Sequence, residues 1–375
     1  MRFIHTADWQ IGKVFKQFGG KEDSLRQARL GAIENIGRLA VEENAGHVVV
    51  AGDVFDNEIP TEVTLRAPLE RMRLFPQIAW HLLPGNHDPH RPQGLWERLA
   101  RLGVPANVHL HLEPKPVQLG NEAVLLPAPL TRKSETNDLT DWMDGAETAA
   151  GIVRIGLAHG SIVDFGTEGE ANNPIDPQRP VKARLDYLAL GDWHRTLQVG
   201  PAAWYAGTPE PDRAGSQEQG QALLVEIAGA GAPAIVKPIA VGTYRWLTRD
   251  EKFSDGSELP DLDARLRAIE NLSHVILRLR LTGTITLSSR AELSHRLLSL
   301  EAAMFHLDAD QSALQARPTQ ADLEAIDFDG VLRRVADKLL VQMNDGASEA
   351  ERLCAQEALI QLYLMQAAPA GAEAA

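Results

Sequence analysis

Apolar runs and helical patterns alternate along the N-terminal part of the chain. Short apolar runs predict buried strands near residue 3 and over residues 47–51 and 78–83, because such runs are typical of strands that are covered on both faces. Apolar residues at helical spacing predict helices over about residues 24–44 and 61–74. Because strand and helix alternate repeatedly, we expect a layered α/β fold.

The following residues are richer in strands. Apolar runs predict strands over residues 108–112, 123–126, 152–158, 187–190 and 221–227. We expect residues 221–227 to form the last strand of this unit. Residues 228–233, which read AGAGAP, are small and predict a hairpin tip or the edge of a linker.

The C-terminal third alternates helix and strand again. We expect a helix over residues 261–271, a strand over 274–281, a helix over 289–303 and a strand over 304–307. Two amphipathic helices follow, over residues 329–344 and from Ser348 to about residue 365, and Ser348 with Glu351 forms a capping-box pattern. The predicted domains are therefore residues 1–240, 241–316 and 317–367, with a disordered tail over 368–375.

Composition narrows the class of protein. Hydrophobic residues make up 44% of the chain and charged residues 23%, enough for a substantial core. The formal net charge of −14 argues against tight DNA binding by this chain alone, because duplex DNA binders usually carry a basic face. Cys354 is the single cysteine, which excludes an intrachain disulfide and a cysteine zinc site. No signal peptide or membrane-length apolar run is evident, so we expect a cytoplasmic protein.

Polar side chains follow five of the predicted strands. They are Asp8 with Gln10, Asp53 with Asp56, Asn86 with His87, His159, and Asp192 with His194. In α/β sheets, ligands bind beyond the carboxyl ends of the strands, so we expect these side chains to meet. Clustered carboxylates repel one another unless cations lie between them. Carboxylate, amide and imidazole donors suit manganese, iron or zinc, and two bridged divalent ions would create a hydrolytic site.

Each of these short motifs also has an ordinary structural explanation. A Gly-Asp pair is often a turn or a helix cap, and a His-Gly pair is usually on the surface. The order of the motifs, each at a predicted strand end, favours a functional site over five unrelated turns.

The ordered set of motifs resembles the calcineurin-like metallophosphoesterase superfamily. The motifs are Asp8-Trp9-Gln10, Gly52-Asp53 with Asp56, Gly85-Asn86-His87-Asp88, His159-Gly160 and Gly191-Asp192-Trp193-His194. Within it, the segments HTADW, GDVFD and YAGTPE, which begin at residues 5, 52 and 205, are similar to SbcD-type DNA-repair exonuclease subunits. The resemblance implies a four-layer αββα sandwich over about 240 residues, a small α/β capping domain and C-terminal helices.

The resemblance also implies a role for each motif residue. Asp53 would bridge two divalent metal ions, with Asp8, Gln10 and His194 on the first and Asn86, His159 and Asp192 around the second. His87 would protonate the leaving oxygen of the scissile phosphate, and Asp56 would orient His87.

Two residues depart from the family pattern. Gln10 and Asp192 stand where histidines are usual. A neutral amide and an added carboxylate make the site harder and more anionic, which favours Mn²⁺, the expected ion, or Mg²⁺ over Zn²⁺, with Fe²⁺ as a further alternative. The other interpretation is a homologue that has lost its activity.

Four residues in or near the motifs could contact nucleic acid directly. Trp9 and Trp193 suit base stacking, but packing is the commoner role of such a tryptophan. Lys13 and Arg195 are placed either to meet phosphate or to lie on solvated surface.

The implied function is metal-dependent hydrolysis of DNA, in partnership with an SbcC-like ATPase and without a membrane. The terminal helix pair would dock on that ATPase or pack on its own domain, and a homodimer stays open. The alternatives are a phosphodiesterase or phosphatase acting on small nucleotides, and a catalytically inactive scaffold for the ATPase.

Overall fold

The computed structural model of the chain describes residues 1–163, 172–215, 217–319, 321–322 and 330–367. The chain divides into two compact units, Met1–Trp246 and Leu247–Ala375. All the predicted site residues belong to the first unit. The predicted boundaries after residues 240 and 316 remain predictions, and the predicted disordered tail lies outside the described residues.

The first sheet of the first unit is mostly parallel. β1, β2, β3 and β4 pair in parallel in that order, and β13 and β14 extend the sheet beyond β1 with antiparallel pairing. The strands are β1 Arg2–Thr6, β2 His47–Val50, β3 Ala79–Leu82, β4 Val108–Leu110, β13 Gln219–Glu226 and β14 Ile235–Phe253. The connections contain η1 Lys16–Phe18, α1 Glu22–Glu42, α2 Glu62–Arg73 and α3 Leu95–Leu102.

The second sheet has the order β11-β12-β10-β7-β6-β5. Its strands are β5 Val117–Leu119, β6 Ala123–Ala128, β7 Val153–His159, β10 Tyr187–Gly191, β11 Leu197–Gly200 and β12 Ala203–Tyr205. β6, β7, β10 and β12 pair in parallel, so β7 and β10 end at the same edge. Short elements lie between them, namely η2 Asp141–Gly145, β8 Ser161–Ile162, β9 Pro174–Ile175 and α4 Arg179–Lys182.

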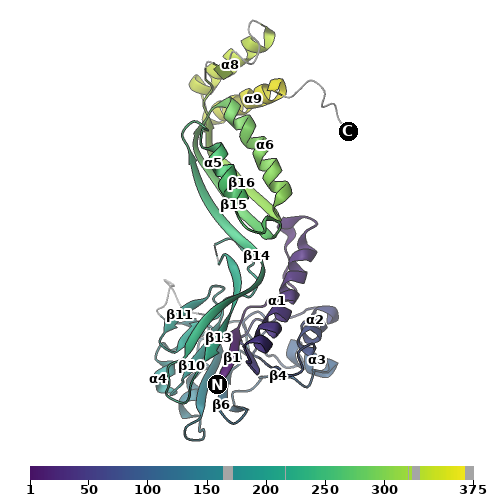
Figure 1. The fold of residues 1–375 in the computed structure, drawn as a ribbon, viewed down its shortest axis with the longest axis vertical. Coiled ribbons are helices and arrows are strands. Elements are labelled where there is room, and N and C mark those ends of the chain that lie inside the picture. The colour runs from purple at the N-terminus through teal and green to yellow at the C-terminus, as the bar shows by residue number, and fades with distance from the viewer. Residues whose placement is uncertain (164–171, 216, 320, 323–329, 368–375) are drawn as a thin grey trace. The chain divides into compact units, whose positions relative to one another are not determined.

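Both sheets are covered on both faces, which explains why their strands are continuously apolar. In β1 and β2, Phe3 and Val49 pack toward the second sheet, whereas Ile4, Val48 and Val50 pack among the residues of α1, α2 and α3. Residues of η2 and the segment after α4 cover the outer face of the second sheet. Figure 1 shows α1, α2 and α3 on one side of these sheets and α4 on the other. The expected layered α/β fold is confirmed.

The second unit is a smaller α/β assembly. β15 Val275–Ile285 and β16 His306–Ala316 pair in parallel, and α6 Leu287–Ala303 connects them. α5 Leu259–Arg267, η3 Leu272–His274 and α6 contribute to one apolar core with these strands. α8 Val331–Asp345 and α9 Glu349–Ala367 pack against each other. At the start of α9, Ser348 Oγ accepts the N–H of Glu351 at 3.2 Å, as the capping pattern predicts.

One strand prediction was wrong and another differs from the structure in its bounds. Residues 221–227 do not form the last strand of the first unit, because β14 follows and pairs with β13 from Ile235 onward. The polar residues and Pro238 in β14 obscure its pattern in the sequence. The strand expected over residues 304–307 is β16, which begins at His306 and continues to Ala316. Its exposed positions carry Asp308 and Asp310, so hydrophobicity alone shows little of its length.

Candidate metal centre

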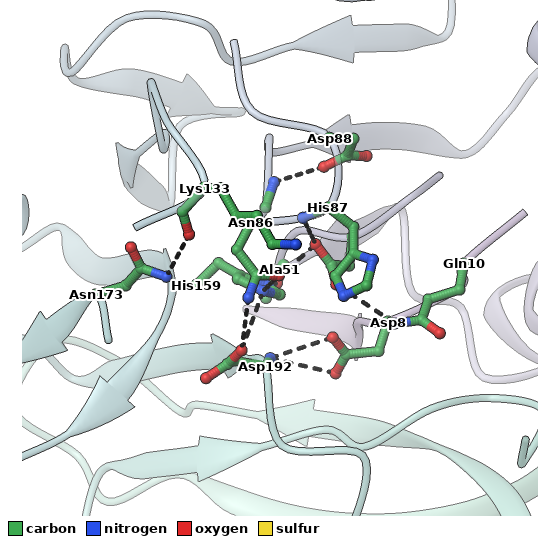
Figure 2. Close-up of polar contacts among 12 residues, drawn as sticks. Asp8, Gln10, Ala51, Asn86, His87, Asp88, Lys133, His159, Asn173 and Asp192 are labelled. Atoms are coloured by element: carbon green, nitrogen blue, oxygen red, sulfur yellow. Dashed lines mark hydrogen bonds and ion pairs between the residues drawn. The ribbon is translucent and has the colours of Figure 1, made fainter. Parts of the chain in front are cut away.

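The five groups of polar residues lie at strand ends, as predicted. Each group lies at the end of one strand or just after it. In chain order, the strands are β1, β2, β3, β7 and β10, and the groups are Asp8 with Gln10, Asp53 with Asp56, Asn86 with His87, His159, and Asp192 with His194. Figure 2 shows side chains from these segments converging on one locus. Parallel pairing places the ends of β1, β2 and β3 together, and those of β7 and β10 together.

The backbone of these loops is held in an unusual conformation. Asp8, Gln10, Asp53 and Asp192 have φ values of 54°, 45°, 54° and 102°. Such left-handed conformations are uncommon for residues other than glycine and persist where the surroundings enforce them. Here the loops hold each other, because the N–H of Asp8 donates to Gly52 O at 3.1 Å and that of Gln10 donates to Asp53 O at 2.9 Å.

Gly85 allows the third loop to approach the second. A β-carbon at this position would collide with the backbone nitrogen and the carboxylate of Asp53. The close approach lets the N–H of His87 donate to Asp53 Oδ1 at 2.9 Å. The glycine of the Gly85-Asn86-His87-Asp88 motif is therefore required for packing at the site.

His159 Nε2 and three side-chain oxygens, all of which could bind a metal ion, lie close together. Nε2 of His159 lies 3.3 Å from Asn86 Oδ1, 3.5 Å from Asp53 Oδ1 and 3.7 Å from Asp192 Oδ1. Its Nδ1 lies 2.8 Å from the carbonyl oxygen of Ala51, which can only accept a hydrogen bond. Nδ1 therefore carries a proton, and Nε2 is the nitrogen directed at the other three donors, as in metal-binding histidines.

Burial and charge favour a cation at this locus. Burial, with smaller contributions from Asp53 and Asp192, raises the pKa of Asp8 to about 6. Burial lowers the pKa of His159, but the carboxylates of Asp53, Asp8 and Asp192 outweigh it and raise that pKa to about 9. Asp8, Asp53 and His159 are buried, and their ligand atoms lie within 4.8 Å of one another. This donor set fits a divalent metal ion, which would take the place of the protons.

The Asp8 side of the site contains Gln10 and His194. Gln10 Nε2 lies 3.1 Å from His194 Nε2 and 3.5 Å from Asp53 Oδ2. The Asp8 carboxylate accepts the N–H of Asp192 at 3.1 Å, a contact visible in Figure 2. His194 Nδ1 lies 3.4 Å from Asp212 Oδ2, which turns Nε2 toward the site.

His87 is held by main-chain contacts. Its Nδ1 lies 3.0 Å from the carbonyl oxygen of Asp56, so Nδ1 carries the proton and donates. Asp56 thus contacts His87 through its backbone, whereas its carboxylate lies 3.4 Å from Lys13 Nζ. A carbonyl fixes the orientation and tautomer of the ring but adds less basicity than a carboxylate.

Asp88 and Asp212 contribute to the site although the sequence predicted a role for neither of them. The buried Asp88 carboxylate accepts the N–H of Gly85 at 2.6 Å and that of Phe55 at 2.9 Å, which ties two site loops together. Asp212 lies in the segment after the Thr208-Pro209-Glu210 motif, which was the only sequence signal for it. Its carboxylate contacts both Lys13, at 2.9 Å, and His194.

The two tryptophans beside the site differ in burial. Trp9 is 1% exposed and its indole N–H donates to Thr6 Oγ1 at 3.0 Å, so it packs in the core. Trp193 is 39% exposed, which leaves its ring accessible to a ligand.

Comparison with known proteins gives a family and several relatives. A family model described as calcineurin-like phosphoesterase matches residues 1–225. The SbcD component of the SbcCD nuclease of Rhodobacter capsulatus is 29% identical over 284 residues, covering 62% of this chain and 68% of that protein. The DNA double-strand break repair protein Mre11 of Methanosarcina acetivorans is 23% identical over 271 residues, covering 69% of this chain. The latter alignment spans 42% of that Mre11 protein.

Among solved structures, TT1561 of Thermus thermophilus matches with a TM-score of 0.39 and 12% identity, covering 64% of this chain and 98% of that one.

Among the described residues, no helix has the length and apolar character required to cross a membrane.

Proposed function

Because the chain belongs to the calcineurin-like phosphoesterase family, we propose that this metal-dependent phosphodiesterase hydrolyses DNA. The observation that carries the proposal is the convergence of Asp53, Asn86, Asp192 and His159 beside His87. The names of the relatives, a component of a nuclease and a DNA double-strand break repair protein, support DNA as the substrate.

The proposed centre holds two divalent ions. Asn86, His159 and Asp192 would hold one ion, Asp8, Gln10 and His194 the other, and Asp53 would lie between them. Hard oxygen donors predominate, so we propose Mn²⁺ as the preferred ion. Divalent ions held there would supply Lewis-acid chemistry and neutralise charge on the phosphate oxygens.

His87 is the proposed general acid. With Nδ1 donating to the Asp56 carbonyl, Nε2 is the nitrogen that can deliver a proton to the leaving oxygen. The backbone N–H of His87 donates to Asp53 Oδ1, which holds His87 beside the proposed metal ligands.

An ATPase partner would supply the electrostatic attraction for DNA that this acidic chain lacks. The net charge of −14 gives the chain little electrostatic attraction for DNA. We therefore propose that it works with an SbcC-like ATPase, which the likeness to a component of the SbcCD nuclease of Rhodobacter capsulatus supports.

The test is hydrolysis of labelled single- and double-stranded DNA with added Mn²⁺. We expect cleavage by the wild type and a loss of roughly 100-fold or more in His87→Ala and in Asp53→Asn. His274→Ala, at an exposed histidine of the second unit, is the matched control and should cleave like the wild type.

Other outcomes favour other functions. Hydrolysis of a chromogenic diester without DNA cleavage would replace DNA with a small nucleotide as the substrate. Cleavage that requires the ATPase would support the partnership. Absence of both metal binding and hydrolysis would contradict the proposal and leave a catalytically inactive scaffold.

A further inference from the structure

Lys13 places a fixed positive charge at one side of the metal centre. Its Nζ donates to Gln10 Oε1 at 2.7 Å and lies 2.9 Å from Asp212 Oδ2 and 3.4 Å from Asp56 Oδ1. An ammonium group has three hydrogens, and here each has an acceptor. The side chain is 25% exposed, so the charge is partly shielded from water.

This ammonium determines which way the Gln10 amide faces. An ammonium group can only donate, so the Gln10 atom at 2.7 Å from it must be the oxygen. The amide nitrogen consequently faces His194 Nε2 at 3.1 Å and Asp53 Oδ2 at 3.5 Å. Both of those atoms are proposed metal ligands, so an N–H₂ donor is directed at the atoms that would bind a cation.

On the opposite side, the Asn86 amide also directs an N–H₂ group at a proposed ligand, because its Nδ2 lies 3.3 Å from Asp192 Oδ1. Its oxygen, however, already faces His159 Nε2 at 3.3 Å, whereas the Gln10 oxygen faces Lys13. Around His159 Nε2, the atoms of Asn86, Asp53 and Asp192 at 3.3–3.7 Å are oxygens that can all coordinate a metal ion. Ser161 Oγ donates to Asp192 Oδ2 at 3.0 Å, whereas Asp192 Oδ1 accepts from Asn86 Nδ2 and lies 3.7 Å from His159 Nε2. The two sides of the centre therefore differ in the ammonium charge beside Gln10 and in the direction of the amide oxygen, which faces Lys13 on one side and His159 on the other.

We propose that Lys13 makes the two metal positions unequal, so that they fill in sequence. The position at Asn86 and His159 fills first. The position at Gln10 and His194 fills only when Lys13 releases the Gln10 oxygen and the amide turns. The inference rests on the proposed two-ion centre and assigns Lys13 as a positioning residue that acts through Gln10.

Asp56 and Asp212 can still pair with the Lys13 ammonium group after it has released Gln10. Both carboxylates already contact Lys13, so its charge need not leave the site when the Gln10 contact breaks. The competition is thus electrostatic as well as geometric. Removing the ammonium charge should strengthen binding at the second position by about tenfold or more.

The experiment is a Mn²⁺ titration of the metal-free full chain without DNA, followed by calorimetry and by the electron paramagnetic resonance spectrum. We expect the wild type to bind one ion tightly with a mononuclear spectrum, and a second ion more weakly with a spin-coupled spectrum. In Lys13→Met the second affinity should rise about tenfold while the first changes little. Lys13→Arg, which keeps the charge, should retain the weak second site.

Controls separate this effect from misfolding and from nuclease activity. Lys16→Met, in η1, should titrate like the wild type, and melting curves should show that every variant is folded. Equal affinities for both ions in the wild type, or an unchanged second affinity in a folded Lys13→Met variant, would overturn the inference. Neither result depends on DNA hydrolysis, whereas failure of the wild type to bind any Mn²⁺ would contradict the proposed function as well.

Discussion

At the scale of single residues, the site depends on contacts between loops that are distant in sequence. Asp88 is the clearest case, because its carboxylate accepts two N–H groups from Gly85 and Phe55. Burial and the nearby Asp53 carboxylate raise the pKa of Asp88 well above its ordinary value. The residue thus joins the loop of His87 to the loop of Asp53.

Replacement of Asp88 should therefore destabilise the first unit. In Asp88→Ala, two buried N–H groups lose their acceptor, and we expect a loss of about 2–4 kcal/mol in the free energy of unfolding. Urea unfolding followed by tryptophan fluorescence measures it, because the Trp96 indole contacts the Asp88 backbone. Asp23→Ala, at an exposed position of α1, is the control. A loss below about 1 kcal/mol would contradict this role.

The positions of the predicted site residues at strand ends could be read from the sequence, whereas their roles remain predictions. Each of the nine predicted residues follows a strand that the apolar pattern had located. What the sequence did not show was the mode of contact. Asp56 reaches His87 through its carbonyl, and its carboxylate meets Lys13. Residue types alone do not distinguish a backbone contact from a side-chain contact.

At the scale of elements, β2, β3, β4 and the residue that follows β4 bring four histidines together. His47 Nδ1 lies 3.0 Å from His81 Nε2, and His81 Nδ1 lies 2.9 Å from His111 Nε2. The rings of His109 and His81 stack at 5.1 Å. Burial, followed by the charges of His109 and Lys115, lowers the pKa of His111 to about 4, and burial also lowers the pKa of His47 and His81.

This chain of imidazoles should make the first unit sensitive to acid. A histidine whose pKa is lowered on folding is neutral in the native state and binds a proton on unfolding. Its contribution to stability is therefore complete above the unfolded pKa of about 6.5. That contribution is lost as the pH falls from about 6.5 toward 4, the folded pKa of His111.

We expect the melting temperature of the wild type to fall between pH 7 and pH 5, and to fall less in His111→Leu, which lacks one of these groups. The comparison is the change with pH, because the substitution also alters stability at pH 7. His274→Ala, outside the cluster, should follow the wild type. Identical pH dependence in wild type and His111→Leu would show that the cluster does not govern acid stability.

At the scale of the whole molecule, the proposed metal centre favours hydrolysis of DNA, whereas the acidic net charge disfavours DNA binding. The centre is suited to phosphodiester hydrolysis, but the chain carries a net charge of −14. Attraction to DNA comes mainly from lysine and arginine that neutralise phosphates. The isolated chain should therefore bind DNA weakly even if it cleaves it.

The measurement is fluorescence anisotropy of labelled duplex DNA with His87→Ala, in which we expect little cleavage during the measurement. At 0.15 M salt we expect a Kd weaker than about 1 µM, in the range of non-specific binding. Addition of the ATPase partner should tighten it. Nanomolar binding by the chain alone would place a basic surface on this chain that its composition does not suggest.

By itself, the sequence determined the apolar strands that carry the site and the polar residues at their ends, because these follow from local patterns of hydrophobicity and from short motifs. Tertiary structure alone decided which donor atoms face one another. The contacts of Lys13 with Gln10, Asp212 and Asp56 and the long partner strand β14 depend on segments that meet only after the sheets have formed. Contacts between such distant segments depend on strand order and loop packing, which cannot be read from a local sequence pattern.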